Sequence, residues 1–322
     1  MRSRGVAQRL LTRREALALA SGCLLGATGL ARSRPAAATP LPVVEIAPGV
    51  FVHEGVHELA TPENLGGIAN VGFVLGNEAV AVIDTGGCAR AGARLHASIR
   101  QITDLPIRYV IASHVHPDHL FGHAAFAPEA PAFVGHAKLP AALAMRGDYY
   151  LDDLRETLGA AADGTEVLAP TMVVEDRAEL DLGGRTLTLV AHPTAHTDND
   201  LSVFDDTTGT LWLADLLFMD RIPVIDGSLL GWLEVLETVR GWPAERVVPG
   251  HGPTSAPWPA AAADQVRYLE RLRDEIRDLI ATGGTIEEAV ARVGNAERAS
   301  WRLFEFYHPR NVTAAFAELE WE

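Results

Sequence analysis

Cysteine is nearly absent from this chain of 322 residues, which contains only Cys23 and Cys88. Cys23 lies in an N-terminal segment that we expect to be removed, and Cys88 alone cannot form an internal disulfide. Lysine is rarer still: Lys138 is the only one, so arginine carries almost all the basic charge. The fold must therefore be stable without disulfide bonds.

Basic charge is also scarce, with 27 Lys and Arg against 42 Asp and Glu and a formal charge of -15. The first 38 residues hold seven of these bases and one acid, which leaves a charge of -21 on the rest of the chain. Such a surface repels phosphate backbones and anionic lipid headgroups, so we expect neither nucleic acid nor membrane insertion. A positive pocket could exist where metal ions supply the charge.

Long apolar runs are missing too, including from residues 1–38, where the apolar stretch is too short and weak to span a membrane. That segment has a basic start, an Arg-Arg pair at 13–14, a modest apolar run and a Pro-Ala-Ala-Ala ending at Ala38. This order is typical of a twin-arginine signal peptide and predicts cleavage after Ala38 and a periplasmic protein. The alternatives are an arginine-rich leader without an export role and a lipid anchor at Cys23.

The rest of the chain alternates strand and helix patterns. Strands are expected at 50–53, 71–75, 79–83 and 107–112, then at 171–174, 187–190, 201–204, 211–213 and 246–248. Helices are expected at 89–101, 120–126, 139–158, 229–239 and 260–280. Two groups of strands, each followed by helices, predict an α/β sandwich of two sheets with helices outside. We assign residues 39–256 to a main domain and 257–322 to a helical extension packed on it.

The strand at 107–112 leads directly into His114-Val115-His116-Pro117-Asp118-His119. Imidazole and carboxylate are the usual zinc ligands where thiolates are absent. His114 and His116 are two residues apart in extended chain, so their side chains face one way. Asp118 and His119 follow the bend at Pro117 and can face a second ion. Histidines do cluster by chance, but four potential ligands in six residues after a buried strand favour a metal site.

Three further candidate ligands follow later strands: His196, Asp215 and His251. Each is weak evidence alone, and Asp215 could equally be a helix cap. Together they recur at one topological position, the end of a strand, which predicts that they converge with the first cluster.

At these residues the chain resembles the metallo-β-lactamase superfamily, whose mark is His-x-His-x-Asp-His followed by His, Asp and His at separate strand ends. The resemblance covers residues 43–253 and implies an αββα sandwich of two mixed β-sheets with helices on the outer faces. It also implies two zinc ions, with iron or a mixed pair as the alternative. The implied ligands are His114, His116 and His196 for the first ion, Asp118, His119 and His251 for the second, and Asp215 as the bridge.

Within the superfamily the chain is similar to the quinoprotein relay system zinc metallohydrolases and the related sulfur-oxidation-associated hydrolases. Besides the metal motif, the similarity rests on His57-Glu58, on the segments 63–66 and 193–200, and on the tail 311–316. It implies a link to a periplasmic quinoprotein dehydrogenase system and leaves the substrate open.

Metal ions that lower the pKa of water supply a nucleophile and stabilise a developing oxyanion. We expect Asp118 to be the catalytic group that orients this nucleophile, and Asp84 to orient a ligand or turn from behind. His57 and Asn199 are candidate substrate contacts, although a surface histidine and a turn residue are equally consistent. The remaining histidines considered are expected to be structural: His123, His136, His192 and His308.

The sequence therefore predicts an exported hydrolase of a small-molecule ester, thioester, lactone or lactam. A di-iron redox protein on the same fold is a second hypothesis, disfavoured because that branch has an acid where His116 stands. A non-catalytic accessory protein is disfavoured by the complete ligand set. A β-lactamase remains open, although some groups of those enzymes have cysteine in place of Asp215.

Overall fold

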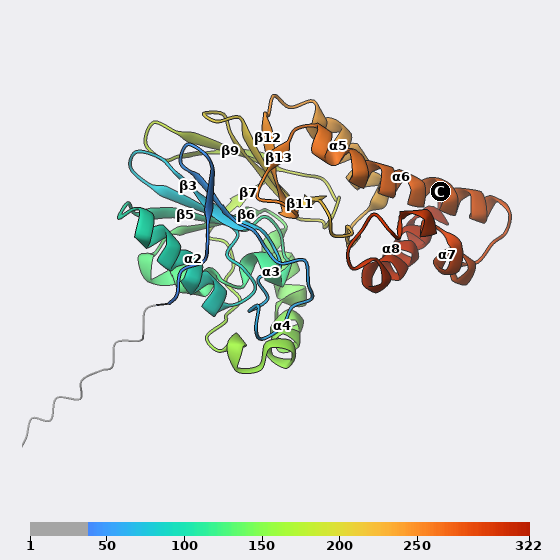
Figure 1. Cartoon of the computed structure of the whole chain (residues 1–322), viewed down its shortest axis with the longest axis horizontal. Coiled ribbons are helices and arrows are strands. Elements are labelled where there is room, and N and C mark those ends of the chain that lie inside the picture. The colour runs from blue at the N-terminus through green and yellow to red at the C-terminus, as the bar shows by residue number, and fades with distance from the viewer. Residues whose placement is uncertain (1–37) are drawn as a thin grey trace, which may run out of the picture. The chain divides into compact units, whose positions relative to one another are not determined.

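The computed structural model describes residues 38–322, so the predicted signal peptide lies outside it except for Ala38, and Cys23 lies outside it altogether. The described part consists of two β-sheets stacked face to face with helices on both outer sides (Figure 1). None of its helices is both long and apolar enough to cross a membrane.

The first sheet has seven strands in chain order: β1 (Val44–Ala47), β2 (Val50–His53), β3 (Val71–Leu75), β4 (Val80–Ile83), β5 (Ile107–Ile111), β6 (Ala132–His136) and β7 (Met172–Val174). The pairs from β1 to β4 are antiparallel, and those from β4 to β7 are parallel. Parallel strands bring their carboxyl ends to one edge, so the loop after β5 opens at an edge that β4 and β6 share.

The second sheet has six strands in the order β13 (Ala256–Pro257), β12 (Arg246–His251), β11 (Thr210–Phe218), β10 (Leu201–Asp205), β9 (Thr186–Ala191) and β8 (Arg177–Asp181). Its pairs are antiparallel except for β11 with β12. Both sheets are therefore mixed, as the resemblance implied, and the predicted fold class is confirmed.

Alternation along the strands divides the apolar residues between an inner and an outer core. On β4, Ala81 and Ile83 face the second sheet, while Val80 and Val82 face the outer helices. On β11, Trp212 fills the inner core and Leu213 the outer one. Strands buried on both faces read as continuous apolar runs, which is why their positions could be predicted.

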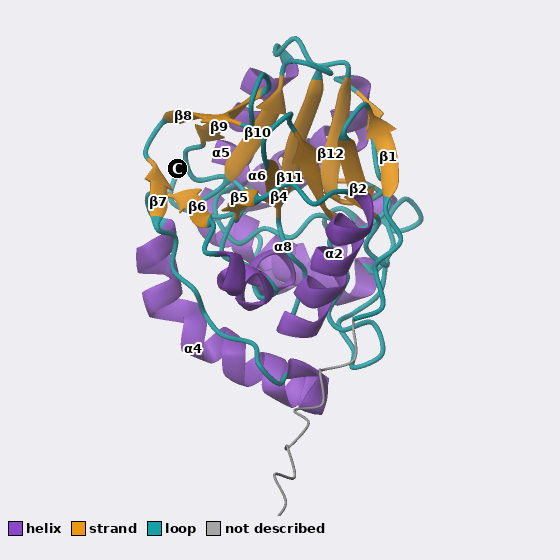
Figure 2. Ribbon diagram, turned by 90° about the vertical axis from the view of Figure 1, so that its left-hand side faces the viewer, coloured by secondary structure: helices purple, strands orange, loops and turns teal. Residues whose placement is uncertain are grey.

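The helices cover the two outer faces (Figures 1 and 2). On the side of the first sheet lie α2 (Ala89–Ile102), α3 (Pro117–Leu120) and α4 (Leu139–Leu158). On the side of the second sheet lie α5 (Leu229–Arg240), α6 (Ala263–Ala281), α7 (Ile286–Arg292) and α8 (Phe304–Leu319). The last three helices share one apolar cluster with β11 and α5, through residues such as Leu216, Trp232, Leu269 and Phe316.

The structure differs from expectation in several elements. Strands β1, β6, β8 and β13 were not predicted, and the helix expected at 120–126 is instead the short α3 followed by a 3-10 helix, His123–Glu129. Strand β11 is longer than predicted and runs on to Phe218, so Asp215 lies inside a strand rather than at its end. The pairing of β11 with β12 shifts register at Ala214, whose φ is +46°. This irregularity re-aims the following side chain.

Candidate metal centre

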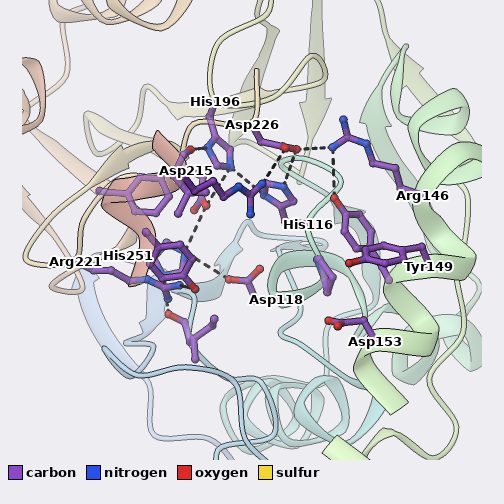
Figure 3. A pocket seen from close by; sticks show the side chains of 17 residues that line it. His116, Asp118, Arg146, Tyr149, Asp153, His196, Asp215, Arg221, Asp226 and His251 are labelled. Carbon is purple, nitrogen blue, oxygen red and sulfur yellow. Dashed lines mark hydrogen bonds and ion pairs between the residues drawn. The ribbon is translucent and has the colours of Figure 1, made fainter. Parts of the chain in front are cut away.

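All seven predicted ligands lie together at one end of the sandwich. Figure 3 shows five of them, His116, Asp118, His196, Asp215 and His251. They come from four places in the chain: the loop after β5 with α3, the segment between β9 and β10, strand β11, and the end of β12. Their candidate ligand atoms fall into two groups, each with atoms within 4.8 Å of one another. The first group is His114, His116, His196 and Asp215, and the second is Asp118, His119 and His251.

In the first group, Nδ1 of His116 lies 3.0 Å from Nε2 of His114 and 3.0 Å from Nε2 of His196. The opposite nitrogen of each ring has its own partner. Nδ1 of His196 donates to the backbone oxygen of Val224 at 2.7 Å, and Nδ1 of His114 lies 2.9 Å from Ser113 Oγ. The three remaining nitrogens converge on one point.

In the second group, Nε2 of His251 lies 3.5 Å from Oδ2 of Asp118, and Nε2 of His119 lies 3.7 Å from the same oxygen. Asp215 stands between the groups. Its Oδ1 is 3.0 Å from His119 Nε2, and its Oδ2 is 3.4 Å from Nε2 of both His196 and His251. A carboxylate so placed can contact two ions at once, which is the bridging position that the resemblance implied.

The hydrogen-bond partners fix where the ring protons must be. Ser113 Oγ donates to Asp84 Oδ2 at 2.8 Å, so it can only accept from Nδ1 of His114, whose Nε2 is then a bare lone pair. His119 donates from Nδ1 to Asp84 at 2.8 Å, and His251 from Nδ1 to the oxygen of Ile68 at 2.7 Å. When these rings are neutral, their Nε2 lone pairs therefore face carboxylate oxygens. Lone pairs and carboxylates directed at one space repel each other unless a cation lies between them.

Two buried atoms support the same conclusion. His119 Nε2 and Asp215 Oδ1 have no well-aligned hydrogen bond within residues 38–322, although they lie 3.0 Å apart. Buried polar atoms without partners are rare and need an explanation. A cation coordinated by both would satisfy them, so the donor set fits metal ions.

The pKa values of the candidate ligand rings differ between the two groups. Burial lowers the pKa of His196 to about 3 and that of His114 well below 6.5, so both are neutral at ordinary pH. Burial alone would lower the pKa of His119 as well, but Asp215, Asp118 and Asp84 raise it well above 6.5. A metal ion at His119 must displace a proton, since only the neutral ring coordinates.

Asp84 lies where the sequence placed it, behind the ligands. Its Oδ1 accepts from the backbone N–H of Ser113 at 2.8 Å, and its Oδ2 accepts from Ser113 Oγ and His119. Its φ of +55° is a strained conformation for a residue other than glycine. One buried carboxylate thereby orients a ligand of each group, His114 through Ser113 and His119 directly.

Gly250 makes room for the bridging residue. A Cβ at this position would lie 1.9 Å from Oδ1 of Asp215. The close approach of β12 to β11 beside the ligands therefore requires glycine immediately before His251.

A cavity of about 620 Å³ lies over the ligands. We call the seven candidate ligands its floor; five of them line the cavity directly, namely His116, Asp118, His196, Asp215 and His251. Its rim comes from helices that the sequence motif does not include: Arg146, Tyr149, Tyr150 and Asp153 of α4, and Tyr307 and Arg310 of α8. Arg221 and Asp226, from the segment between β11 and α5, also line it. None of these was predicted from the sequence, because none belongs to a ligand motif.

Asp226 connects the floor to the rim (Figure 3). Its Oδ2 lies 3.2 Å from Nε2 of His116 and pairs with Arg146, and its Oδ1 accepts from Arg310 Nη2 at 3.1 Å. Burial would raise the pKa of Asp226, but the hydrogen bonds from His116 and Arg146 lower it far below its usual value. The carboxylate keeps the proton of His116 on Nε2 and leaves Nδ1 for a metal ion.

The two predicted substrate contacts do not line the cavity. His57 is half-buried and does not line it, and burial lowers the pKa of its ring. Asn199 is fully buried, also lines no part of it, and donates to Asp198 at 2.7 Å. The structure thus gives neither residue contact with a substrate in this cavity.

The four histidines expected to be structural do have partners elsewhere. His308 contacts Val293 O and Tyr268, His123 contacts Thr85, His136 contacts the oxygen of His192, and His192 contacts Ser202. Cys88 is buried, without a disulfide, and contacts the oxygen of Leu65.

Comparison with known proteins yields a thioesterase and two alkylsulfatases among the proteins similar to this chain. The chain is 29% identical over 219 residues to acyl-coenzyme A thioesterase MBLAC2 of Bos taurus, which covers 58% of this chain and 74% of the relative. It is 24% identical over 240 residues to a linear primary-alkylsulfatase of Pseudomonas sp., covering 63% of this chain but only 44% of that protein. Among solved structures, the sec-alkylsulfatase Pisa1 of Pseudomonas sp. superposes with a TM-score of 0.67 at 17% identity, over 87% of this chain and 50% of that one.

The family model described as the metallo-beta-lactamase superfamily matches residues 65–251. This range holds both ligand groups in full. The quinoprotein-relay branch within the superfamily is not distinguished by these comparisons. On the match across more than half of its length, the chain belongs to the metallo-beta-lactamase superfamily.

Proposed function

We propose that this protein is a zinc-dependent hydrolase that binds two metal ions and cleaves a thioester or ester bond of a small molecule. The observation that carries the proposal is the arrangement of lone pairs on the floor. Five imidazole nitrogens and two carboxylates converge there, while hydrogen bonds to other protein groups hold the opposite ring nitrogens. Nitrogen and oxygen ligands without thiolate suit zinc, with iron as the alternative.

Bound divalent ions would activate water and polarise the scissile group. The protein's own side chains would mainly orient the nucleophile. Asp118 is the floor carboxylate that borders the open cavity, with a side chain 18% exposed, whereas the side chain of Asp215 is 4% exposed. Burial would raise the pKa of Asp118, but His119 and His251 lower it, so it is a carboxylate able to accept a proton or a hydrogen bond from a nucleophile.

The choice of an acyl bond rests on the thioesterase relative, of which the chain covers 74%. Sulfate-ester hydrolysis is a second candidate. It is favoured by the alkylsulfatase relative and by the fold similarity to Pisa1, which covers 87% of this chain and so extends beyond residues 65–251. Lactones and lactams remain candidate substrates, because metal ions held by the same ligands could support their hydrolysis.

The test is a substrate panel on the purified, zinc-loaded mature protein, with metal content measured in parallel. The panel contains a thioester, an aryl ester, a lactone, a cephalosporin and an alkyl sulfate. We expect two zinc ions per chain and turnover of the thioester or ester. Iron, with a one-electron redox couple and no turnover, would instead indicate the redox alternative.

Asp118→Ala is the critical variant, because it removes a ligand and the proposed orienting group together. Asp152→Ala is its matched control, since Asp152 lies on the exposed face of α4 and pairs only with Arg155. Turnover that survives Asp118→Ala at the rate of the control would refute the proposed mechanism.

We further propose export to the periplasm, on the signal pattern in residues 1–38. Replacing the arginine pair at 13–14 by two lysines should retain the precursor in the cytoplasm. A link to a quinoprotein dehydrogenase system remains a prediction from resemblance alone.

A further inference from the structure

Arg221 is a buried arginine without a carboxylate partner. Two arginines between residues 38 and 322 are buried, Arg185 and Arg221, with 8% and 3% of their surface exposed. Arg185 binds Asp205 through two nitrogens. Within residues 38–322, by contrast, Arg221 forms no ion pair, and its Nε has no hydrogen-bond partner. A buried guanidinium without a counter-ion is costly unless something else supplies the charge.

The nearest polar groups do not supply that charge. Arg221 Nη1 lies 3.2 Å from Nδ1 of His251, but that nitrogen already carries the proton it donates to Ile68 O. Nη2 donates to the hydroxyl of Tyr307 at 2.9 Å, and the guanidinium lies 5.2 Å from the centre of the same ring. Between residues 38 and 322, the Tyr307 hydroxyl is therefore the only acceptor hydrogen-bonded to this guanidinium.

The guanidinium lines the cavity beside the second ligand group, opposite Arg146 and Tyr149 (Figure 3). The other two arginines of the cavity, Arg146 and Arg310, are already paired with Asp226. Within residues 38–322, Arg221 is thus the arginine of the cavity wall that no carboxylate pairs with, and its Nε still lacks an acceptor. Tyr307 reaches it from α8, so the C-terminal helices help to position it.

We propose that Arg221, held by Tyr307, binds a negatively charged group of the substrate, such as a carboxylate, phosphate or sulfate. The inference rests on the proposed hydrolase function and adds that the preferred substrates are anions. It also makes the C-terminal extension part of the substrate site. Paired guanidinium and anion oxygens form charge-assisted hydrogen bonds, which are stronger than neutral ones.

Four thioesters test this and also locate the charge. They combine a neutral acyl group (pentanoyl) or an anionic one (glutaryl) with a neutral leaving group (N-acetylcysteamine) or an anionic one (coenzyme A). We expect Arg221→Met to lower kcat/KM for the preferred anionic substrates about 10–100-fold, the range expected when a hydrogen bond to a charged group is lost. The substrate without charge on either side should change by less than about threefold. The thioesters whose kcat/KM falls show whether Arg221 binds the acyl group or the leaving group.

Arg155→Met is the matched control, because Arg155 is exposed on α4 and pairs only with Asp152. Arg221→Lys should restore part of the preference, since it returns the charge without the planar fork. An equal fall for all four thioesters in Arg221→Met would show that Arg221 supports the fold or the metal ligands, and would overturn the proposal.

Binding provides a readout that does not need turnover. Glutarate, coenzyme A and inorganic sulfate are titrated calorimetrically into the zinc-loaded wild type and Arg221→Met. Weaker binding of at least one anion by the variant supports the proposal, and equal affinities for all three overturn it. Failure of the hydrolase function would show separately, as absence of Asp118-dependent turnover of any thioester in the wild type.

Discussion

The floor and the rim of the cavity are built in opposite ways. The floor ligands are nearly all buried, and they come from β11, from the end of β12 and from the segments that follow β5 and β9. A hydrogen bond on the opposite ring nitrogen holds each imidazole. The rim comes from α4 and α8, and Tyr149 on it is 69% exposed. Groups held by several partners keep one geometry, whereas exposed helical side chains can adapt. The difference indicates that the floor determines the reaction and the rim selects the substrate.

The sharpest test of this difference is Asp215→Ala. Its carboxylate contacts both ligand groups, so we expect zinc to fall below two per chain and kcat to fall by more than about a hundredfold, since even the outer partners of metal ligands cost 10–100-fold. The same change at the rim, Asp153→Ala, should alter kcat by less than about threefold. Comparable losses for the two variants would remove the distinction between floor and rim.

Asp84→Asn should have the next largest effect. The amide cannot accept from Ser113 and His119 as the carboxylate does, so a ligand of each group loses its orientation. We expect zinc affinity to fall about 10–100-fold, measured by competition with a chelator. An unchanged affinity would show that the ligand rings are held well enough by packing alone.

Acidification should separate the two ligand groups. The raised pKa of His119 means that protons compete for the second group at a higher pH than for His114 and His196, whose pKa values are lowered. As the pH falls, one zinc ion per chain should therefore leave first, and the other should follow in more acidic buffer. Zinc content after dialysis at a series of pH values measures this. Loss of both ions at one midpoint would contradict it.

Arg146→Met should have the smallest effect. Asp226 keeps His116 and Arg310 as partners, and the side chain of Arg146 is 40% exposed, so its ion pair contributes little. We expect KM to change by no more than about fivefold, with zinc content unchanged. A loss of zinc in this variant would mean that the rim determines the geometry of the floor.

The floor could be predicted from the sequence for a physical reason. Four of its ligands lie within six residues after a buried strand, and the others lie beside strands whose apolar runs mark them clearly. Asp215 was assigned to a strand end and lies instead within β11, because nothing in the sequence marks the irregularity at Ala214.

The rim could not be predicted in this way. Arg146 and Arg310 look like ordinary charged residues of amphipathic helices, and Asp226 lies in a loop without a motif. They meet only because α4 and α8, far apart in sequence, flank the same cavity. His57 and Asn199 were predicted as candidate substrate contacts, but neither side chain lines the cavity.

The apolar cluster between β11 and the last helices limits how the protein can be divided. Leu216 and Trp232 pack against Leu269 of α6 and Phe316 of α8. A recombinant fragment that stopped at residue 256 would leave these side chains facing water and would aggregate rather than yield a minimal enzyme. Grafting new specificity onto this protein by exchanging its last 66 residues with those of a homologue would likewise require matching the buried surfaces as well as the side chains that reach the ligand.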